Sequence, residues 1–271
     1  MHHGLGGLFP AETSSLCRND VVMPTRLLVV LLLCLRLVTL HPVTVRGEAP
    51  PSSASLAAAD ALFSYGEDHA RDQQALTILE RVLAREPRSY QALWRAARAA
   101  YHVGEEADER AKVASFERGI QWGQQAVAQQ PEGVDGHFWL GANYGGLSSV
   151  KGIVQALAMV QQVRTEMETA LRLQADYEQG SAYRALGELA RQLPGVLGGS
   201  RKRALAYLEQ GVRVAPQNLA LKLSLARAYR EADQHEASRQ QLREILQMPR
   251  RPARATADSR TQDKARQLLA H

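Results

Sequence analysis

The sequence predicts an all-α fold, an α-solenoid of about five helix hairpins with elongated middle units. Ala, Leu, Gln, Glu and Arg dominate the 271 residues, and only 6% are aromatic; this mixture favours helices over strands. Small and large residues also recur with a spacing close to the 34 residues of the tetratricopeptide hairpin. Because 45% of the residues are hydrophobic, the chain can bury a core between such hairpins.

The first element is an N-terminal extension of 47 residues, which we expect to direct export. The short basic start M-P-T-R at 23–26 precedes an apolar run at 27–35. This order is typical of the n- and h-regions of a secretory signal, with Met23 as the true start and cleavage before Glu48. Arg36 leaves the run well short of the ~20 residues of a membrane span. An uncleaved anchor is the alternative interpretation.

Both cysteines, Cys17 and Cys34, lie in this extension, so the rest of the chain contains neither disulfides nor thiolates. Three leucines precede Cys34, whereas a lipoprotein cysteine follows small residues, and lipid attachment is therefore not expected. We expect the mature protein in the periplasm. A Pro- and Ser-rich linker at 48–56 then leads into a helical domain at 57–248.

The first two hairpins follow from the positions at which the repeat requires small or large side chains. The first closes with Ala75, Leu79, Val82 and Pro87. The second opens with Trp94, Ala97 and Tyr101 and closes with Gly119, Gly123, Ala126 and Pro131. The closing landmarks of this hairpin lie nine residues later than the 34-residue repeat would place them. This offset predicts additional sequence around residues 103–111.

The last three hairpins show the same landmarks. The third opens with Leu140, Gly141 and Tyr144 and closes with Val163, Met167, Ala170 and Ala175. The fourth opens with Leu186 and Gly187 and closes with Ala204, Leu208, Gly211 and Pro216, and the fifth opens with Leu225, Ala226 and Tyr229. The third is ten residues too long and the fourth five, which predicts long helices or loops at hairpin tips. Residues 249–271 then form a basic linker and a short helix at about 261–270.

Glycine-rich stretches mark the expected structural turns. Gly145 and Gly146 are expected to end the first helix of the third hairpin, and Ser148 and Ser149 to cap the next one. A second turn is expected at Pro194, Gly195, Gly198 and Gly199. That stretch lacks the G-x-x-x-x-G-K-[ST] pattern of a phosphate loop, and we interpret it as a connection between helices.

Charge and histidine placement exclude several classes of site. Without the first 47 residues, 29 basic and 26 acidic residues remain in an interleaved order, which indicates a solvated helical surface rather than a nucleic-acid-binding one. The eight His residues show no metal-ligand spacing. His137 has no neighbouring Cys, Ser or carboxylate with which to form a catalytic set. We therefore expect no enzyme, no cofactor and no metal.

The repeat register predicts a partner-binding groove, because the first helices of tetratricopeptide hairpins line the concave face of a solenoid. Its predicted residues are Arg95, His102, Arg184, Glu188, Arg191, Arg227 and Arg230. Five Arg on one surface suit a carboxylate ligand or an acidic peptide, since guanidinium pairs bidentately with carboxylates. The alternative is that Arg is the usual polar residue of this chain, which has 28 Arg and five Lys.

Three stretches carry a family resemblance. They are G-H-F-W-L-G-A-N-Y-G-G-L-S-S-V-K-G at 136–152, A-L-G-E-L-A-R-Q-L-P-G-V-L-G-G at 185–199 and A-L-A-Y-L-E-Q-G-V-R-V-A-P-Q-N at 204–218. In them the chain resembles the T-component family of TRAP transporters (tripartite ATP-independent periplasmic transporters), and the similarity covers roughly residues 57–248. It implies an exported helical solenoid that self-associates, pairs with a periplasmic solute-binding subunit and holds an apolar or organic-acid ligand.

The resemblance also places the ligand site on the central hairpin. The residues that it implies there are His137, Trp139, Asn143, Tyr144 and Lys151, and the repeat register adds Phe138. We therefore expect a non-enzymatic exported scaffold paired with a solute-binding subunit and only indirectly in contact with the membrane. The alternative is a generic cell-envelope scaffold that binds acidic peptides through the Arg-lined groove.

Overall fold

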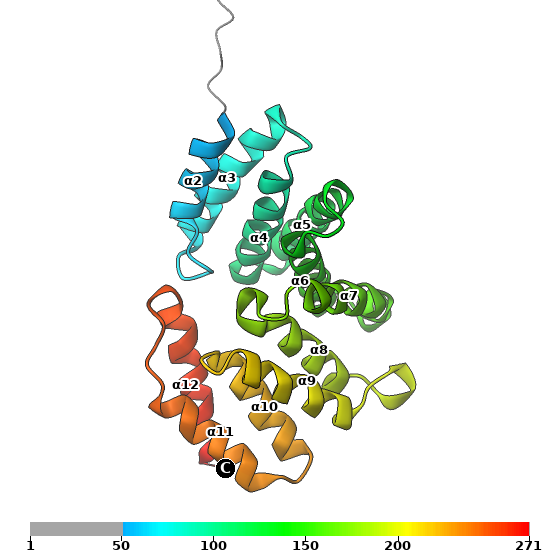
Figure 1. Ribbon diagram of the computed structural model, residues 1–271, viewed down its shortest axis with the longest axis vertical. Coiled ribbons are helices and arrows are strands. Elements are labelled where there is room, and N and C mark those ends of the chain that lie inside the picture. The colour runs from blue at the N-terminus through cyan, green and yellow to red at the C-terminus, as the bar shows by residue number, and fades with distance from the viewer. Residues whose placement is uncertain (1–50, 271) are drawn as a thin grey trace, which may run out of the picture. The chain divides into compact units, whose positions relative to one another are not determined.

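The computed structural model describes residues 51–270, and the structural statements below refer to them. This part of the chain contains α-helices and short 3₁₀ turns without a strand (Figure 1). The α-helices are α2 Pro51–Leu62, α3 His69–Arg85, α4 Tyr90–Glu106, α5 Glu109–Gln129, α6 Val134–Val150, α7 Ile153–Leu173, α8 Ser181–Gln192, α9 Arg201–Val214, α10 Leu219–Glu231, α11 His235–Gln247 and α12 Ala255–Leu269. The 3₁₀ turns are η1 Tyr177–Gly180, η2 Gly195–Leu197 and η3 Pro252–Arg254.

Consecutive helices pack in pairs, and the pairs follow one another along the chain (Figure 1). The pairs are α2 with α3, α4 with α5, α6 with α7, α8 with α9, and α10 with α11. Each pair also packs against the next, through contacts such as α5 on α6 and α7 on α8, and α12 packs against α11 and α10. The predicted all-α solenoid of five tetratricopeptide-like hairpins is confirmed, with α12 as an additional helix.

The landmark residues of the repeat form the core between the helices. On α3, Ala75, Leu79 and Val82 are all buried, and they lie three to four residues apart, on one face of the helix. Leu208 of α9 is fully buried in the same way. Burial of these stripes, rather than the modest intrinsic helix propensity, holds the hairpins together.

The elongation of the middle units lies in their second helices. α5 and α7 have 21 residues each, whereas α9 has 14 and α11 has 13. In the second hairpin the additional sequence extends both helices, so that only Ala107 and Asp108 separate them. Asp108 makes this tight connection possible because its side chain accepts the N–H of Ala111 at 2.9 Å and caps α5.

The expected helix end at Gly145 and Gly146 is wrong. α6 continues through both residues to Val150, and the hydroxyls of Ser148 and Ser149 donate to the carbonyls of Gly145 and Gly146 at 2.7 Å instead of capping α7. A Cβ at Gly146 would lie 2.5 Å from the ring of Phe116. The glycine therefore allows α6 to approach α5 closely, and this packing outweighs the low helix propensity of glycine.

The turn expected at 194–199 lies between α8 and α9 as predicted. Gly198 has a φ of 85°, a left-handed conformation that residues with a Cβ rarely adopt. The N–H of Gly199 donates to the carbonyl of Pro194 at 2.9 Å, and Ser200 then caps α9 by accepting the N–H of Arg203. Val196 at the tip of this turn is 95% exposed.

Both boundaries of the helical domain differ from the prediction. α2 begins at Pro51, inside the expected linker at 48–56, because an Ala-rich run of strong helix formers follows. At the other end α12 begins at Ala255 rather than near 261. Here the carboxylate of Asp258 accepts the N–H of Arg251 at 2.8 Å, which turns the basic segment back onto the first turn of the helix.

Several predictions concern residues that lie outside the described part of the chain. They are the secretory signal, its start at Met23, the cleavage site before Glu48 and the two cysteines, Cys17 and Cys34. Export therefore stays a prediction from the sequence. Within residues 51–270, none of the helices combines the length and the apolar character needed to cross a membrane.

Candidate partner-binding cavity

A cavity of about 570 Å³ lies along the first helices of the second to fifth hairpins. α4, α6, α8 and α10 provide most of its lining, and α7, η1, η3 and α12 provide the rest. The repeat register predicted the groove on this face, because first helices line the concave side of such arrays. Its volume lies in the range of about 300–1,000 Å³ that is typical of ligand pockets.

Part of the lining of the cavity is aromatic. Phe138 and Trp139 on α6 and Tyr101 and His102 on α4 all line it. The ring of Trp139 lies 4.9 Å from Phe138, 5.9 Å from Tyr101 and 5.6 Å from His102, centroid to centroid, and tilted and edge-to-face contacts of this kind are favourable. The indole N–H of Trp139 donates to the hydroxyl of Tyr177 at 3.1 Å, which fixes the ring in the wall.

His102 brings a buried imidazole to this aromatic part of the lining. Its side chain is buried, and its Nε2 has no hydrogen-bond partner within residues 51–270. Burial, together with the positive charges of Arg254 and Arg98, lowers the pKa of His102 to about 3. The imidazole is therefore neutral at physiological pH, and its Nε2 is a buried polar atom without a partner in the described residues.

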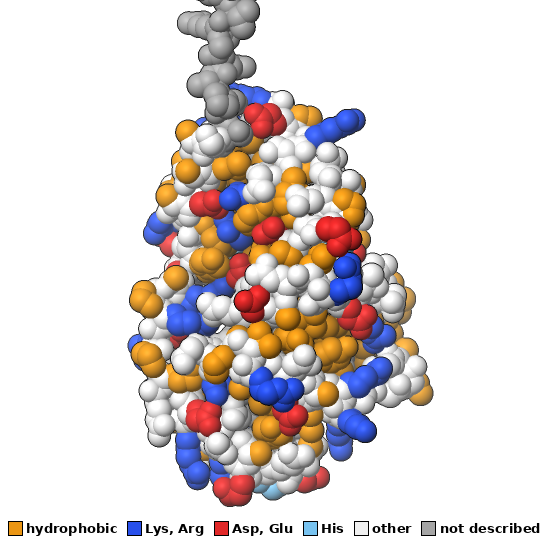
Figure 2. Space-filling model, in the orientation of Figure 1, with side chains coloured by type: hydrophobic (Ala, Val, Ile, Leu, Met, Phe, Trp, Pro, Cys, Tyr) orange, Lys and Arg blue, Asp and Glu red, His pale blue; other side chains and the backbone are white. Residues whose placement is uncertain are grey.

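Three cationic side chains also line the cavity. They are Arg184 on α8, Arg227 on α10 and Lys264 on α12, and within residues 51–270 none of the three forms a direct hydrogen bond or ion pair, although the charges of Arg184 and Glu105 act on each other. Elsewhere basic and acidic side chains alternate over the face drawn in Figure 2, with hydrophobic side chains between them. Three cations without partners beside one cavity therefore stand out from the mixed surface.

Three carboxylates, those of Glu105, Glu178 and Glu188, also line the cavity. Although burial favours its protonated form, hydrogen bonds from Ser224, Arg191 and Gln192 hold the pKa of Glu188 below its ordinary value, so this charge is already engaged. Burial raises the pKa of Glu105 against the opposing charges of Lys112 and Arg184. Glu178 forms an ion pair with Arg254 at 3.1 Å. The lining therefore holds four basic and three acidic side chains beside its aromatic residues.

The predicted groove residues divide into two sets. Those that line the cavity are His102, Arg184, Glu188 and Arg227. Arg95, Arg191 and Arg230 lie outside its lining. Arg95 turns towards the first hairpin, where it pairs with Asp60 at 2.9 Å, and Arg191 forms ion pairs with Glu188 and Glu231. Arg230 is exposed near the end of α10.

The predicted ligand residues of the central hairpin also divide, and only Phe138 and Trp139 line the cavity. Asn143 is fully buried and donates to the carbonyls of Ala97 at 2.9 Å and Trp139 at 2.7 Å. It therefore joins α4 to α6. A buried polar side chain of this kind specifies how two helices pack. This packing role accounts for Asn143 in the stretch at 136–152.

The three other predicted ligand residues have partners of their own. His137 contacts Glu166 and the carbonyl of Pro131, Tyr144 accepts a hydrogen bond from Gln124, and Lys151 pairs with Glu117 at 3.2 Å. His137, Asn143 and Lys151 therefore do not converge on a cleft. In residues 51–270, no three His, Cys, Asp or Glu side chains come together as metal ligands would.

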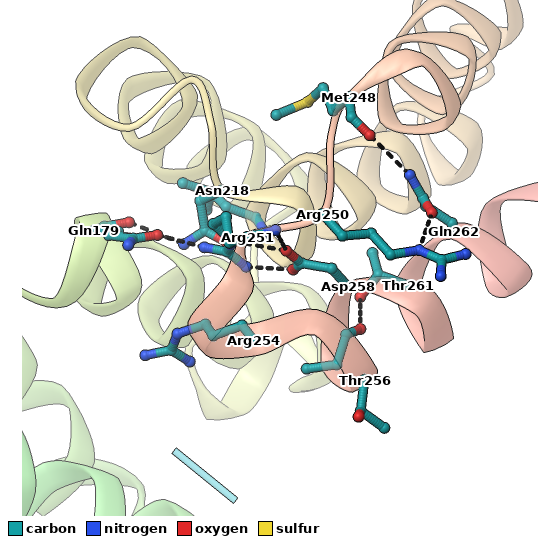
Figure 3. Close-up of polar contacts among 12 residues, drawn as sticks. Gln179, Asn218, Met248, Arg250, Arg251, Arg254, Thr256, Asp258, Thr261 and Gln262 are labelled. Carbon is teal, nitrogen blue, oxygen red and sulfur yellow. Dashed lines mark hydrogen bonds and ion pairs between the residues drawn. The ribbon is translucent and has the colours of Figure 1, made fainter. Parts of the chain in front are cut away.

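Sequence reasoning missed the part of the cavity that the C-terminal segment provides. Figure 3 shows Arg251 between Gln179 and Asp258, with Arg254 on the next turn of the chain. Arg251 binds Asp258 at 2.5 Å and also donates to the side chain of Gln179. The basic segment resembles a solvated linker in the sequence, and its only distinguishing signal is Asp258, seven residues after Arg251.

Comparison with known proteins gives one family and a set of similar folds. Residues 55–193 match the family described as Regulator of microtubule dynamics protein 1-3. That span includes the aromatic residues of the lining and Arg184, but not Arg227 or Lys264. No curated protein matches the chain in sequence.

Two solved structures show the fold. The chain is similar to TTC0263, described as a thermophilic TPR protein in Thermus thermophilus, with a TM-score of 0.59, 20% identity and coverage of 80% of this chain and 98% of that chain. It is also similar to Pseudomonas aeruginosa pilF, with a TM-score of 0.50, 17% identity and coverage of 80% and 92%. At these identities the likeness shows a tetratricopeptide-type solenoid and nothing finer. None of these matches is to a TRAP transporter T component.

Proposed function

Because the chain belongs to the Regulator of microtubule dynamics protein 1-3 family, we propose that it is a non-enzymatic interaction scaffold whose cavity holds an acidic segment of a partner protein. One observation carries this proposal: Arg184, Arg227 and Lys264 stand without partners within residues 51–270, beside an aromatic wall. A cation in a partly enclosed site gains most from a carboxylate, since guanidinium and carboxylate form paired, charge-assisted hydrogen bonds.

The aromatic wall specifies the rest of the segment. Phe138 and Trp139 present apolar surface to the cavity, and burial of an apolar side chain there contributes about 25 cal/mol for each Å² removed from water. We therefore expect an acidic residue and a neighbouring aromatic or large aliphatic residue to bind together. A segment with only one of the two features should bind weakly.

The test uses a fluorescein-labelled peptide of alternating Glu and Leu residues and fluorescence anisotropy. Arg184→Glu and Arg227→Glu should each weaken binding by about tenfold or more, because a hydrogen bond to a charged group contributes about 1.5–3 kcal/mol. Arg213→Glu on α9 is the matched control, since Arg213 is exposed and does not line the cavity. Equal affinities for all three variants and the unaltered chain would refute the proposal.

A second candidate is the one that the TRAP T-component resemblance implies, an exported scaffold that pairs with a periplasmic solute-binding subunit and holds a small organic acid. The position of Phe138 and Trp139 on the cavity wall favours it, because both belong to the motif that carries the resemblance. A pull-down from periplasm that recovers a solute-binding subunit supports it. Recovery of the chain in the cytoplasm, with its N-terminus intact, contradicts both export and this pairing.

The family description supplies one more class of partner. Proteins of the family are described as regulators of microtubule dynamics, and we therefore include microtubules among the partners to be tested. Co-sedimentation with polymerised tubulin, compared between the unaltered chain and Arg184→Glu, measures this directly. Loss of pelleting in the variant would make the cavity the contact surface.

A further inference from the structure

The two ends of the described helical array meet through polar contacts. The carboxylate of Glu67, in the loop after α2, accepts the N–H of Thr256 at 2.7 Å and that of Ala257 at 3.0 Å. These two donors belong to the first turn of α12, where N–H groups have no partner inside the helix. A residue 189 positions earlier in the chain therefore caps the last helix.

Guanidinium groups of the C-terminal segment add to this contact. Arg254 lies 4.4 Å over the ring of Tyr65 and pairs with Glu178 at 3.1 Å, while Arg251 donates to the side chain of Gln179. We call these contacts the clasp. Its members are Tyr65, Glu67, Glu178 and Gln179 on one side and Arg251, Arg254, Thr256 and Ala257 on the other.

Backbone strain is concentrated at the clasp. Within residues 51–270, four residues other than glycine have a positive φ, and three of them are Tyr65 at 57°, Glu178 at 45° and Gln179 at 55°. Each of these three contacts an arginine of the C-terminal segment. A side chain with a Cβ adopts this conformation only where its surroundings hold it there. Two loops with this backbone conformation therefore meet at the clasp, and the first of them is also held by the hydrogen bonds of Asp72 to Ser64 and Gly66.

Apolar packing does not reinforce the clasp. Ala265 of α12 packs with Leu219, Leu223 and Ile245 of α10 and α11. In the described part of the chain, no side chain of α12 joins the apolar cluster that contains Leu76 and Leu79 of the first hairpin. Partly exposed polar contacts without apolar burial are weak and sensitive to salt. The first hairpin can therefore separate from α12 while α12 stays docked on α10 and α11.

The clasp also borders the cavity. Glu178, Arg254 and Lys264 line the cavity and lie on the segments that the clasp joins. On this basis we propose that the clasp is a gate, and that its opening controls entry to the cavity. The inference rests on the proposed function for the identity of what enters, and the experiment separates the two.

The first measurement is the access of a small solute to Trp139. Its side chain is 3% exposed on the cavity wall, and Trp94→Phe with Trp122→Phe leaves it as the only tryptophan of the full-length chain. In that background Glu67→Ala should raise the fraction of open molecules by about threefold to tenfold, because it removes partly exposed charge-assisted hydrogen bonds. Quenching of Trp139 by acrylamide should rise by the same factor. Glu132→Ala is the control, because Glu132 forms an exposed pair with Arg172 outside the clasp.

The second measurement uses a covalent cross-link that should keep the clasp closed. Arg260 of α12 lies 3.6 Å from Glu106 at the end of α4, next to the clasp. In a chain with Cys17→Ser and Cys34→Ser, Glu106→Cys and Arg260→Cys can be joined by a short bismaleimide. The joined protein should show reduced quenching of Trp139, and Glu67→Ala should no longer raise it.

The outcomes distinguish the gate from the proposed function. If neither Glu67→Ala nor the cross-link changes the quenching of Trp139, the gate is overturned, whether or not the Glu-Leu peptide binds. If both change it but the peptide binds no form, the gate stands and the acidic-segment function falls. Should Glu67→Ala fail to fold by circular dichroism, a salt series on the single-tryptophan chain replaces it. Quenching that does not rise between about 0.05 and 1 M NaCl overturns the gate, because salt weakens partly exposed ionic contacts.

Discussion

The Nδ1 atom of His137 lies 2.6 Å from the Oε2 atom of Glu166, and this contact joins α6 to α7. The other ring nitrogen, Nε2, lies 2.8 Å from the carbonyl oxygen of Pro131. Both partners can only accept hydrogen bonds, so only the protonated imidazolium, which donates from both nitrogens, satisfies them together. His137 is therefore a structural cation, although its place in the sequence made it the most conspicuous candidate ligand.

This arrangement gives the fold a pH dependence that can be measured. The hydrogen bond to Glu166 raises the pKa of His137 above 6.5, and burial opposes the shift without reversing it. A group whose pKa is raised on folding stabilises the fold fully below its unfolded pKa, and this contribution is lost as the pH rises through the folded pKa. His137→Gln should therefore lower the free energy of unfolding by about 1–2 kcal/mol at pH 6 and by clearly less at pH 9, as measured in urea.

His235→Gln is the matched control for this experiment. His235 is exposed at the start of α11, and its replacement should leave the free energy of unfolding unchanged at both pH values. A His137→Gln variant that loses more stability at pH 9 than at pH 6 would show that the imidazole is bound in its neutral form.

The packing of α6 on α5 gives a second prediction. Gly146→Ala should destabilise the fold by about 1–3 kcal/mol, because the new Cβ would meet the ring of Phe116 at 2.5 Å. The adjacent Gly145→Ala meets no atom within 4 Å and should stabilise the fold by up to about 1 kcal/mol through helix propensity. Thermal unfolding of both variants checks the pair. Equal effects would mean that propensity, rather than the contact with Phe116, governs both sites.

The two glycines also show where sequence reasoning succeeds and where it ends. The repeat is a local pattern, so Ala75, Leu79 and Leu208 were placed correctly on buried faces. Whether a glycine ends a helix or lets another helix approach depends on what packs against it. Phe116 lies thirty residues before Gly146, and no local pattern reveals that contact.

The candidate site shows the same division. The register predicted a groove along the first helices, and a cavity lies there with Arg184 and Arg227 in its lining. Arg254 was missed because it reaches the cavity only when the C-terminal segment folds back onto Glu178, 76 residues away. Asn143 was expected at the ligand site, and the structure buries it between α4 and α6. A buried amide that joins two helices and an amide that binds a ligand look alike in sequence.

The loop that carries Tyr65 and Glu67 depends on a single buried carboxylate, which gives a third prediction. Asp72 is fully buried and accepts hydrogen bonds from the N–H of Ser64 at 2.7 Å, its hydroxyl at 3.0 Å and the N–H of Gly66 at 2.8 Å. Asp72→Ala should lower the free energy of unfolding by about 3 kcal/mol, since hydrogen bonds to a buried charge contribute about 1.5–3 kcal/mol. Amide hydrogen exchange at Ser64 and Gly66 should accelerate at the same time.

The neighbouring N-cap of α3 is the control for the loop. Asp68 accepts the N–H of Arg71 at 3.1 Å on the protein surface, and Asp68→Ala should cost only about 1 kcal/mol, as is usual for a cap. If Asp72→Ala costs no more than Asp68→Ala, the buried carboxylate does not hold the loop, and its role in positioning Tyr65 and Glu67 is wrong.

The aromatic wall of the cavity depends on a chain of hydrogen bonds behind it. Trp139 donates to the hydroxyl of Tyr177, which in turn donates to Asp135 at 2.9 Å. Tyr177→Phe leaves the buried indole N–H without its acceptor, and we expect a loss of about 1–3 kcal/mol in stability together with a red shift or broadening of Trp139 fluorescence.

Tyr90→Phe also removes a hydrogen bond to Asp135, at 3.2 Å, but leaves Trp139 untouched. The Tyr90→Phe variant should be less stable, but its Trp139 fluorescence and its affinity for the acidic peptide should not change. A spectral change as large as that of Tyr177→Phe would show that Asp135, rather than Tyr177, sets the position of the Trp139 ring.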